Sequence, residues 1–232
     1  MSRNSSARAL QSSGQLGDGT NITRYTPIQV SSLSGIVAIA AGGLHSLFVK
    51  YDSTAWACGN NVEGEVGDSS TSVFYQYTPV QVYGLTSIAA VAAGAYHSLF
   101  LKSDGTVWAC GWNLYGELGD GTTSQRIAPV QVSSLTGIIA IAAGDFHSRF
   151  LKNDGTVWAC GYNNHGQLGD GTTTDRWTPI QITGLCQIPT AIAEQQQENA
   201  FQIYPNPVTS ELRMEKAELK VLRFGMWWER NA

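Results

Sequence analysis

The sequence predicts an all-β fold, a partial β-propeller of four-stranded antiparallel blades with a short C-terminal β-type tail. Charged residues make up only 14% of the 232 residues while glycine occupies 25 positions, a composition typical of strands and tight turns. A segment also recurs every 50 or 52 residues, a period typical of repeat architectures. Because no segment shows a 3.6-residue apolar period long enough for a helix, a helical solenoid is excluded.

Three short strings define the repeat. WACG begins at Trp56, Trp108 and Trp158. An AAG string followed by two variable residues and His-Ser places its histidine at His45, His97 and His147. A Gly-x-x-Gly-Asp string begins at Gly14, Gly64, Gly116 and Gly166, and a proline follows each at Pro27, Pro79, Pro129 and Pro179. The single longer step arises from two extra residues between Asp68 and Thr78. About three repeats are complete, and partial ones flank them.

Each repeat is predicted to contain four short strands, which in the second repeat are TPVQV (78–82), IAAVAAG (88–94), HSLFLK (97–102) and TVWACG (106–111). The first opens with proline, which suits the start of a strand. The second is small and apolar throughout, as expected of a strand covered on both faces. The last two flank Asp104-Gly105, a hairpin turn in which glycine supplies the positive φ.

The residues that follow this pattern identify a family. The string AAGxxHSLFLKSDGTVWACGWNLYGELGDGT closely resembles the regulator of chromosome condensation repeat, and the resemblance recurs through about 170 of the 232 residues. Kelch repeats have a similar period, but their paired-glycine signature is absent. The departure is a cysteine at Cys58, Cys110 and Cys160, where the family often has an apolar residue. Because closed propellers of this family contain more blades, we expect a piece of a longer product or one half of a self-associating assembly.

Four regions are predicted: an irregular leader (1–13), the propeller repeats (14–185), a polar Gln-rich linker (186–200) and a tail (201–232). Ile203-Tyr204-Pro205-Asn206-Pro207 resembles the start of the C-terminal sorting domain read by type IX secretion in Bacteroidetes-like bacteria. This resemblance implies a bacterial protein that is secreted or displayed on the outer cell surface. A chance Pro-Asn-Pro turn is the alternative. The end, VLRFGMWWERNA, departs from that domain, as expected after a frameshift or a truncation.

Composition and motifs exclude several functions. The formal net charge of −4 provides no basic stripe, so a nucleic-acid partner is not expected. No apolar run reaches the roughly 18 residues of a membrane span. The first residues contain no apolar stretch, so they are not a signal peptide as written. No carboxylate pair, nucleophile elbow or phosphate-binding glycine loop is present, so we expect a protein that is not an enzyme and needs no cofactor.

The repeated His, Cys and Asp residues are interpreted as structural. Equivalent positions on neighbouring sheets lie about 10 Å apart, too far for histidines to share one zinc ion. Each histidine is instead expected to satisfy backbone groups inside its own blade. The three WACG cysteines are interpreted as small buried residues, and Cys186 has no evident partner. One aspartate per loop supplies too few oxygens for calcium, so Asx-turn bonding is expected at Asp18, Asp68, Asp120 and Asp170.

Candidate binding residues are found where the repeats differ. The loops at the blade ends vary mainly in aromatic residues, and aromatic side chains are effective anchors for a partner. The candidates are Tyr96, Trp112, Tyr115, Phe146, Tyr162, Phe74 and Tyr75. Drift on an unconstrained surface would produce the same variation. His165 is interpreted as a surface residue.

The predicted function is therefore the binding of a protein or glycan through propeller loops, without catalysis. One alternative is a regulatory interaction protein similar to the guanine nucleotide exchange factor of the family. A second is an inhibitor of a secreted enzyme such as a β-lactamase. A third, a propeller lyase or hydrolase, would need converging catalytic groups that the repeat does not supply.

Overall fold

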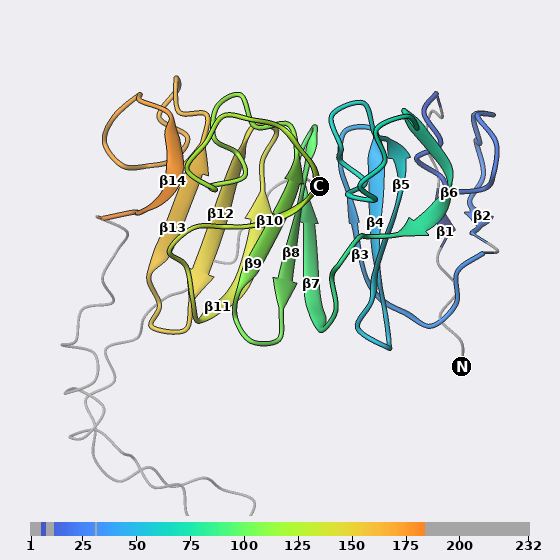
Figure 1. The fold of residues 1–232 in the computed structure, drawn as a ribbon, viewed down its shortest axis with the longest axis horizontal. Coiled ribbons are helices and arrows are strands. Elements are labelled where there is room, and N and C mark those ends of the chain that lie inside the picture. Colours follow the sequence, from blue (N-terminus) through green and yellow to red (C-terminus); the bar gives the residue numbers. More distant parts are fainter. Residues whose placement is uncertain (1–5, 8–11, 31, 184–232) are drawn as a thin grey trace, which may run out of the picture. The chain divides into compact units, whose positions relative to one another are not determined.

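The computed structural model describes residues 6–7, 12–30 and 32–183, and in this part of the chain it is all-β. Three four-stranded antiparallel sheets stand side by side as the blades of a partial propeller (Figure 1), which confirms the predicted fold class. Blade 1 contains β3 (Ile36–Ala41), β4 (His45–Lys50), β5 (Ala55–Asn60) and β6 (Tyr75–Gln81). Blade 2 contains β7 (Ile88–Ala93), β8 (His97–Lys102), β9 (Val107–Gly111) and β10 (Arg126–Gln131). Blade 3 contains β11 (Ile138–Ala143), β12 (His147–Lys152), β13 (Val157–Gly161) and β14 (Arg176–Gln181).

A partial sheet precedes blade 1, in which β1 (Ser6–Ala7) pairs with β2 (Ile28–Gln29). Within every complete blade the strands pair in chain order, so each strand forms an antiparallel hairpin with the next. None of the described residues belongs to a helix long and apolar enough to cross a membrane.

The predicted Asp-Gly turns are confirmed. Gly105 and Gly155 have φ angles of +79° and +82°, a left-handed conformation that glycine adopts without strain. The Asp104 carboxylate accepts a hydrogen bond from the backbone N–H of Thr106 at 2.9 Å, which fixes the turn between β8 and β9. We call this end of the blades, with residues 51–54, 103–106 and 153–156, the hairpin end.

The proline-containing strand differs from the prediction in two ways. First, it closes the preceding blade: β6 pairs with β5 of blade 1, so the structural blade is offset from the sequence repeat that begins at Thr78. Second, Pro79 does not open the strand, because β6 already begins at Tyr75. The register shifts between Gly59↔Gln76 and Ala57↔Val80, so Pro79 lies in a bulge of an outer strand, where a missing N–H breaks no ladder bond.

The hydrophobic core lies between consecutive blades. Phe100 of blade 2 is fully buried in a cluster with Leu47 and Val49 of blade 1, and Phe150 of blade 3 is buried in the same way against Leu99 of blade 2. Burying one such side chain contributes about 1.5–3 kcal/mol. Each blade is therefore stabilised mainly by its neighbours, as in other repeat proteins.

The first strand of each blade (β3, β7 or β11) is called its inner strand, and among the described blades it is covered on both faces only in blade 2. In β7, Val91 packs against blade 1 and Ala92 against blade 3, as predicted for the apolar segment 88–94. The equivalent strands of the outer blades depart from that prediction, because Ile39 in β3 is 66% exposed and Ala142 in β11 is exposed. The reason is tertiary: no inner strand is described beyond either of them.

Several predictions fall on residues outside those that the structure describes. They are most of the leader (1–13), the linker (186–200) with Cys186, and the sorting-domain-like tail (201–232).

Candidate aromatic binding face

Four predicted aromatic residues come together at one end of blades 2 and 3. Tyr96 precedes β8 and Tyr115 lies in the β9–β10 loop, whereas Phe146 precedes β12 and Tyr162 follows β13. We call these four side chains the ring cluster. We call the blade end that carries them, with the loops following β5, β9 and β13, the loop face; these loops gather at the upper end of the blades in Figure 1.

Phe146 lies at the centre of the ring cluster. Its ring centroid is 6.0 Å from that of Tyr96, 6.1 Å from that of Tyr115 and 6.4 Å from that of Tyr162. The rings of Tyr115 and Tyr162 are closer still, at 4.7 Å, and His165 extends the row at 6.1 Å from Tyr162. Such distances are those of attractive aromatic pairs, which stabilise one another by about 0.5–1.5 kcal/mol beyond simple burial.

The ring cluster remains accessible to a partner. Tyr96 is 37% exposed, and Tyr115, Phe146 and Tyr162 are half-buried. A half-buried ring loses little conformational entropy on binding because its neighbours already restrict it. The arrangement can therefore act as a set of anchors with exposed ring surface.

Backbone hydrogen bonds hold these loops to one another. Tyr162 donates its N–H to the carbonyl of Phe146 at 2.8 Å, and Trp112 donates to Tyr96 at 2.8 Å. Between blades, Ala95 donates to the carbonyl of Asp145 at 3.0 Å. The loops before β8 and β12 are thus part of one hydrogen-bonded edge, which places rings from two blades in contact.

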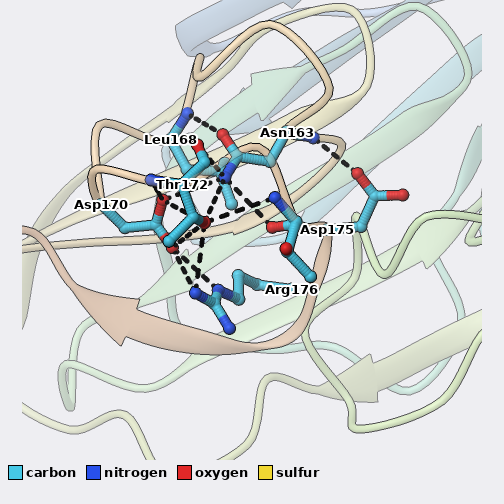
Figure 2. A network of polar contacts seen from close by, with 7 residues as sticks. Asn163, Leu168, Asp170, Thr172, Asp175 and Arg176 are labelled. Atoms are coloured by element: carbon cyan, nitrogen blue, oxygen red, sulfur yellow. Dashed lines mark hydrogen bonds and ion pairs between the residues drawn. The ribbon is translucent and has the colours of Figure 1, made fainter.

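An asparagine organises the long loop that follows Tyr162 (Figure 2). The side-chain amide of Asn163 donates to Asp170 Oδ1 at 3.0 Å and to the carbonyl of Thr172 at 3.1 Å. Its Oδ1 accepts the N–H of Leu168 at 2.9 Å. One buried side chain therefore ties together three separate points of the loop, and Asn113 and Asn61 do the same in blades 2 and 1.

An ion pair completes this network. Arg176 donates to Asp170 Oδ2 through Nε at 2.9 Å and through Nη2 at 2.6 Å. Although desolvation of Asp170 raises its pKa, the hydrogen bonds from Arg176 and Thr172 outweigh it and hold the pKa well below its usual range. The carboxylate also accepts the Thr172 N–H, which confirms the Asx turn expected there.

The same Asx turn is formed at the three other predicted positions, Asp18, Asp68 and Asp120. The arginine is replaced only in blade 1, where Gln76 donates to Asp68 at 2.6 Å. In the described part of the chain no three His, Cys, Asp or Glu side chains form a group that could hold a metal ion.

The other predicted aromatic residues do not join the ring cluster. Phe74 and Tyr75 are exposed at the start of β6, where the ring of Tyr75 is tilted against that of Tyr77 with their centroids 6.4 Å apart. Trp112 is half-buried, and its Nε1 is shielded from solvent with no hydrogen-bond partner in the described chain. The loop face therefore carries two separate aromatic groups, one on blade 1 and one across blades 2 and 3.

His45 and His97 bond a serine of the next blade rather than groups of their own blade, which corrects the prediction. His45 Nε2 lies 3.0 Å from Ser98 Oγ of the next blade, and His97 Nε2 lies 3.0 Å from Ser148 Oγ. Ser98 donates its proton to the carbonyl of Glu65 at 2.6 Å, so it accepts the proton of His45 Nε2. Burial lowers the pKa of His45 to about 4, and the ring is neutral. The reason for the correction is that the curvature of the propeller brings consecutive blades within bonding distance at these positions.

The cysteines are buried free thiols at the same contact between blades. Cys110 Sγ lies 3.6 Å from the carbonyl of Glu65 and Cys160 Sγ lies 3.6 Å from that of Glu117. Burial raises the pKa of Cys58 to about 12. These thiols are therefore protonated packing groups with a weak hydrogen bond, in agreement with their interpretation as small buried residues.

Two buried carboxyl groups were not recognised in the sequence. Glu65 and Glu117 are fully buried, and burial raises the pKa of each to about 7. Glu117 Oε2 accepts the N–H of Tyr115 at 2.9 Å, directly beneath the ring cluster, while its Oε1 has no partner in the described chain. The sequence held one sign of their role: the equivalent position is Gln15 in the first repeat and Gln167 in the last. Glutamine and glutamate side chains at this position accept the same bond, from the backbone N–H two residues earlier.

We expect that Ser148→Ala destabilises the protein by about 1–3 kcal/mol, because it leaves His97 Nε2 without its buried partner and the carbonyl of Glu117 with only the weak bond from Cys160. Urea unfolding followed by tryptophan fluorescence measures the loss. Ser46→Ala is the matched control, because Ser46 donates to the carbonyl of Gln15 and bonds no histidine in the described chain. Equal losses in the two variants would contradict the contribution of the histidine bond.

The family profile described as Regulator of chromosome condensation (RCC1) repeat matches residues 10–49, 52–101, 104–151 and 154–192. A second profile with the same description matches residues 36–65, 88–117 and 138–167. These matches span well over half of the chain.

Curated proteins are similar to about half of the chain. The Ultraviolet-B receptor UVR8 of Arabidopsis thaliana is 33% identical over 116 residues, which are 49% of this chain and 26% of the receptor. The Secretion-regulating guanine nucleotide exchange factor of Bos taurus is 33% identical over 109 residues, which are 46% of this chain and 24% of that protein. The matched part is thus about a quarter of the length of these relatives.

Solved structures share the fold. Human WBSCR16 superposes with a TM-score of 0.69 at 22% identity, over 77% of this chain and 48% of that one. Yeast RCC1 (Prp20), in its structure bound by Kap60, superposes with a TM-score of 0.69 at 22% identity, over 77% of this chain and 44% of that one. With the profile matches and the same blades in both structures, the chain belongs to the Regulator of chromosome condensation (RCC1) repeat family.

Proposed function

We propose that this propeller segment is a non-enzymatic binding module that holds a protein partner on its loop face. The observation that carries the proposal is the convergence of four rings from four loops of two blades. Aromatic side chains dominate the binding energy of many protein interfaces, especially where neighbouring groups fix their position. The backbone bonds between Ala95 and Asp145 and between Tyr162 and Phe146 supply that support.

The comparisons are in line with a role in protein interaction. Yeast RCC1 (Prp20) was solved bound by Kap60, and another structure of Prp20p is described with its binding properties to Gsp1p and histones. The similarity to a guanine nucleotide exchange factor favours a second candidate, a regulatory protein that acts on a nucleotide-binding partner. Both candidates require a partner surface on the propeller.

The proposed location is outside the cell or on the outer cell surface of a bacterium. It is supported by the resemblance of residues 201–215 to a type IX sorting domain. A secreted enzyme would be an accessible partner there, so an inhibitory role remains within the same proposal. Mass spectrometry of the culture medium and of surface-exposed proteins from the source cells tests this location.

The binding proposal is tested by panning a random peptide library against the full chain. We expect enriched peptides whose affinity for Tyr115→Ala and Tyr162→Ala variants is about thirtyfold weaker, the loss typical of an aromatic anchor. Tyr51→Ala is the control, because Tyr51 is 76% exposed at the hairpin end. Circular dichroism confirms that each variant is folded.

Three outcomes are informative. Unchanged affinity in both ring variants, or peptides that lose affinity for Tyr51→Ala instead, would overturn the loop-face proposal. Enrichment of no peptide together with binding of neutral oligosaccharides would replace the protein partner by a glycan. Light scattering of the wild-type chain checks whether a second copy occupies the face, which would make self-association the function of the ring cluster.

A further inference from the structure

All but one of the positive side chains in the described chain are paired with a carboxylate. At the hairpin end, lysines contact the aspartate two residues later, as in Lys102–Asp104 at 3.6 Å. In the long loops, arginines contact the aspartate of the Asx turn, as in Arg126–Asp120 at 2.7 Å. The remaining cation, Arg149, donates to the carbonyl of Gln167 at 2.5 Å. Arg149 is therefore the one described lysine or arginine without a carboxylate partner.

The acidic side chains without a cationic partner in the described chain lie on the loop face. Asp145 is exposed directly beside Phe146, and Asp175 lies in the β13–β14 loop, where its Oδ1 accepts the N–H of Asn163 at 2.7 Å. Glu63 is half-buried at the blade 1 position that corresponds to Tyr115. The carboxylates at the hairpin end, in contrast, are paired with lysines. Negative charge without a paired cation is therefore found on the loop face, with Asp145 and Asp175 next to the ring cluster.

The geometry of the rings suits the same kind of ligand. The Phe146 ring meets Tyr115 edge to face at 81° and Tyr162 edge to face at 73°. Rings in such pairs turn different faces toward their surroundings, and the face of an aromatic ring carries the negative part of its quadrupole. A cation held within about 6 Å of these rings is attracted by them, and more strongly where water is displaced.

We infer that the ring cluster, with Asp145 and Asp175 beside it, binds the arginine or lysine side chains of a basic peptide segment. The inference rests on the proposed function and names the chemistry of its partner. Rings supply cation–π attraction and contact with the methylene stem, while the carboxylates supply charge complementarity. An acidic or phosphorylated segment would instead meet the unpaired carboxylates, with Arg149 as the one described cation that has no carboxylate partner.

The inference is tested with two fluorescein-labelled Gly-Ser peptides that carry spaced arginines or spaced citrullines. Citrulline keeps the shape and most donors of arginine but has no charge. Fluorescence anisotropy with the full chain is expected to show binding of the arginine peptide about five- to thirtyfold tighter than that of the citrulline peptide. Added salt is expected to weaken the binding of the arginine peptide and to leave the binding of the citrulline peptide unchanged.

Ring variants separate the cation–π contact from general attraction to an acidic protein. Tyr162→Leu and Tyr115→Leu keep the net charge and an apolar side chain but remove the ring, so about five- to thirtyfold weaker binding of the arginine peptide is expected. Tyr162→Phe keeps the ring and is expected to bind normally. Asp145→Asn is expected to reduce the salt-dependent part of the affinity for the arginine peptide. Tyr51→Leu at the hairpin end is the control.

The outcomes distinguish this inference from the proposed function. Equal affinity for the arginine and citrulline peptides would overturn the inference of a cationic ligand. Equal affinity of wild type and both leucine variants for the arginine peptide would overturn it as well. If library peptides still depend on Tyr115 and Tyr162 in that case, the loop face binds proteins of another chemistry. Binding of neutral oligosaccharides in place of the arginine peptide would also overturn the inference.

Discussion

Phe100→Ala is expected to lower the free energy of unfolding by about 3–5 kcal/mol. Phe100 is fully buried, and its ring fills the space between blades 1 and 2 against Leu47, Val49 and Val66. Removing it forfeits the burial of the ring and leaves a cavity that the flanking sheets, each held by its own ladder, cannot close. Because each blade is stabilised mainly by its neighbours, this change uncouples blade 1 from blades 2 and 3.

Urea unfolding followed by tryptophan fluorescence measures this loss. Tyr83→Ala is the control, since Tyr83 is 62% exposed and its removal is expected to change stability by less than about 0.5 kcal/mol. Phe150→Ala tests the same relationship between blades 2 and 3. Similar small losses for Phe100→Ala and Tyr83→Ala would show that the contact between blades is not the main source of stability.

Glu65→Gln and Glu117→Gln are each expected to raise the free energy of unfolding by about 3 kcal/mol at pH 8 and to leave it nearly unchanged at pH 4.5. Burial raises the pKa of both carboxyl groups to about 7, well above the ordinary value of 4.5. Glutamine carries no proton to lose, and Gln15 and Gln167 already accept the equivalent backbone bond in their own loops.

The direction follows from proton binding. Between pH 4.5 and about 7 the folded protein keeps protons on Glu65 and Glu117 that the unfolded chain has released, so stability falls as the pH rises through this window. Above pH 7 the folded protein holds buried negative charges and the loss is complete. Each unit of pKa difference corresponds to about 1.4 kcal/mol.

The histidines act in the opposite direction. Burial lowers the pKa of His45 to about 4 and, with the neighbouring histidines, that of His97 to about 3. The stability that these neutral histidines contribute is fully present above pH 6.5, the ordinary pKa, and is lost as the pH falls from there toward their lowered pKa values. It is common to wild type and the glutamine variants, so it cancels in the difference between them.

Urea unfolding of each protein from pH 4.5 to pH 8 measures this difference. Glu63→Gln is the control, because Glu63 is only half-buried and its replacement tests the removal of one negative charge by itself. A constant difference between wild type and the Glu117→Gln variant across the whole range would contradict a raised pKa for Glu117.

Much of the candidate site was visible in the sequence, because the repeats act as internal references for one another. Residues that are the same in every repeat are structural, and the loop positions that vary contain Tyr96, Tyr115, Phe146 and Tyr162. Adjacent repeats bring Tyr96 beside Phe146, its equivalent in the next repeat. Tyr115 and Tyr162 occupy different positions of the repeat, and they meet only in the folded blades. Trp112 varies in the same way but does not join the ring cluster, and its Nε1 is shielded from solvent, since exposure depends on how neighbouring loops fold over it.

Other features depended on contacts between repeats that no single repeat contains. The prediction that each histidine bonds within its own blade was wrong, because Ser98 and Ser148 lie on the following blade. The burial of Glu117 likewise results from blade 3 packing over the loop that carries it. A polar side chain in an apparent surface loop gives no sign of this in the sequence.

The sequence by itself determined the repeat, the four strands of each blade and the hairpin turns, since these depend on local chemistry such as the positive φ of Gly105. It also marked the variable aromatic positions. Only the tertiary structure decided that the strand beginning at Tyr75 closes the preceding blade, that His45 bonds Ser98, and that Asp145 and Asp175 lie next to the ring cluster. The physical reason is that strand pairing between distant segments and packing between blades are set by surfaces that exist only once neighbouring repeats have folded against each other.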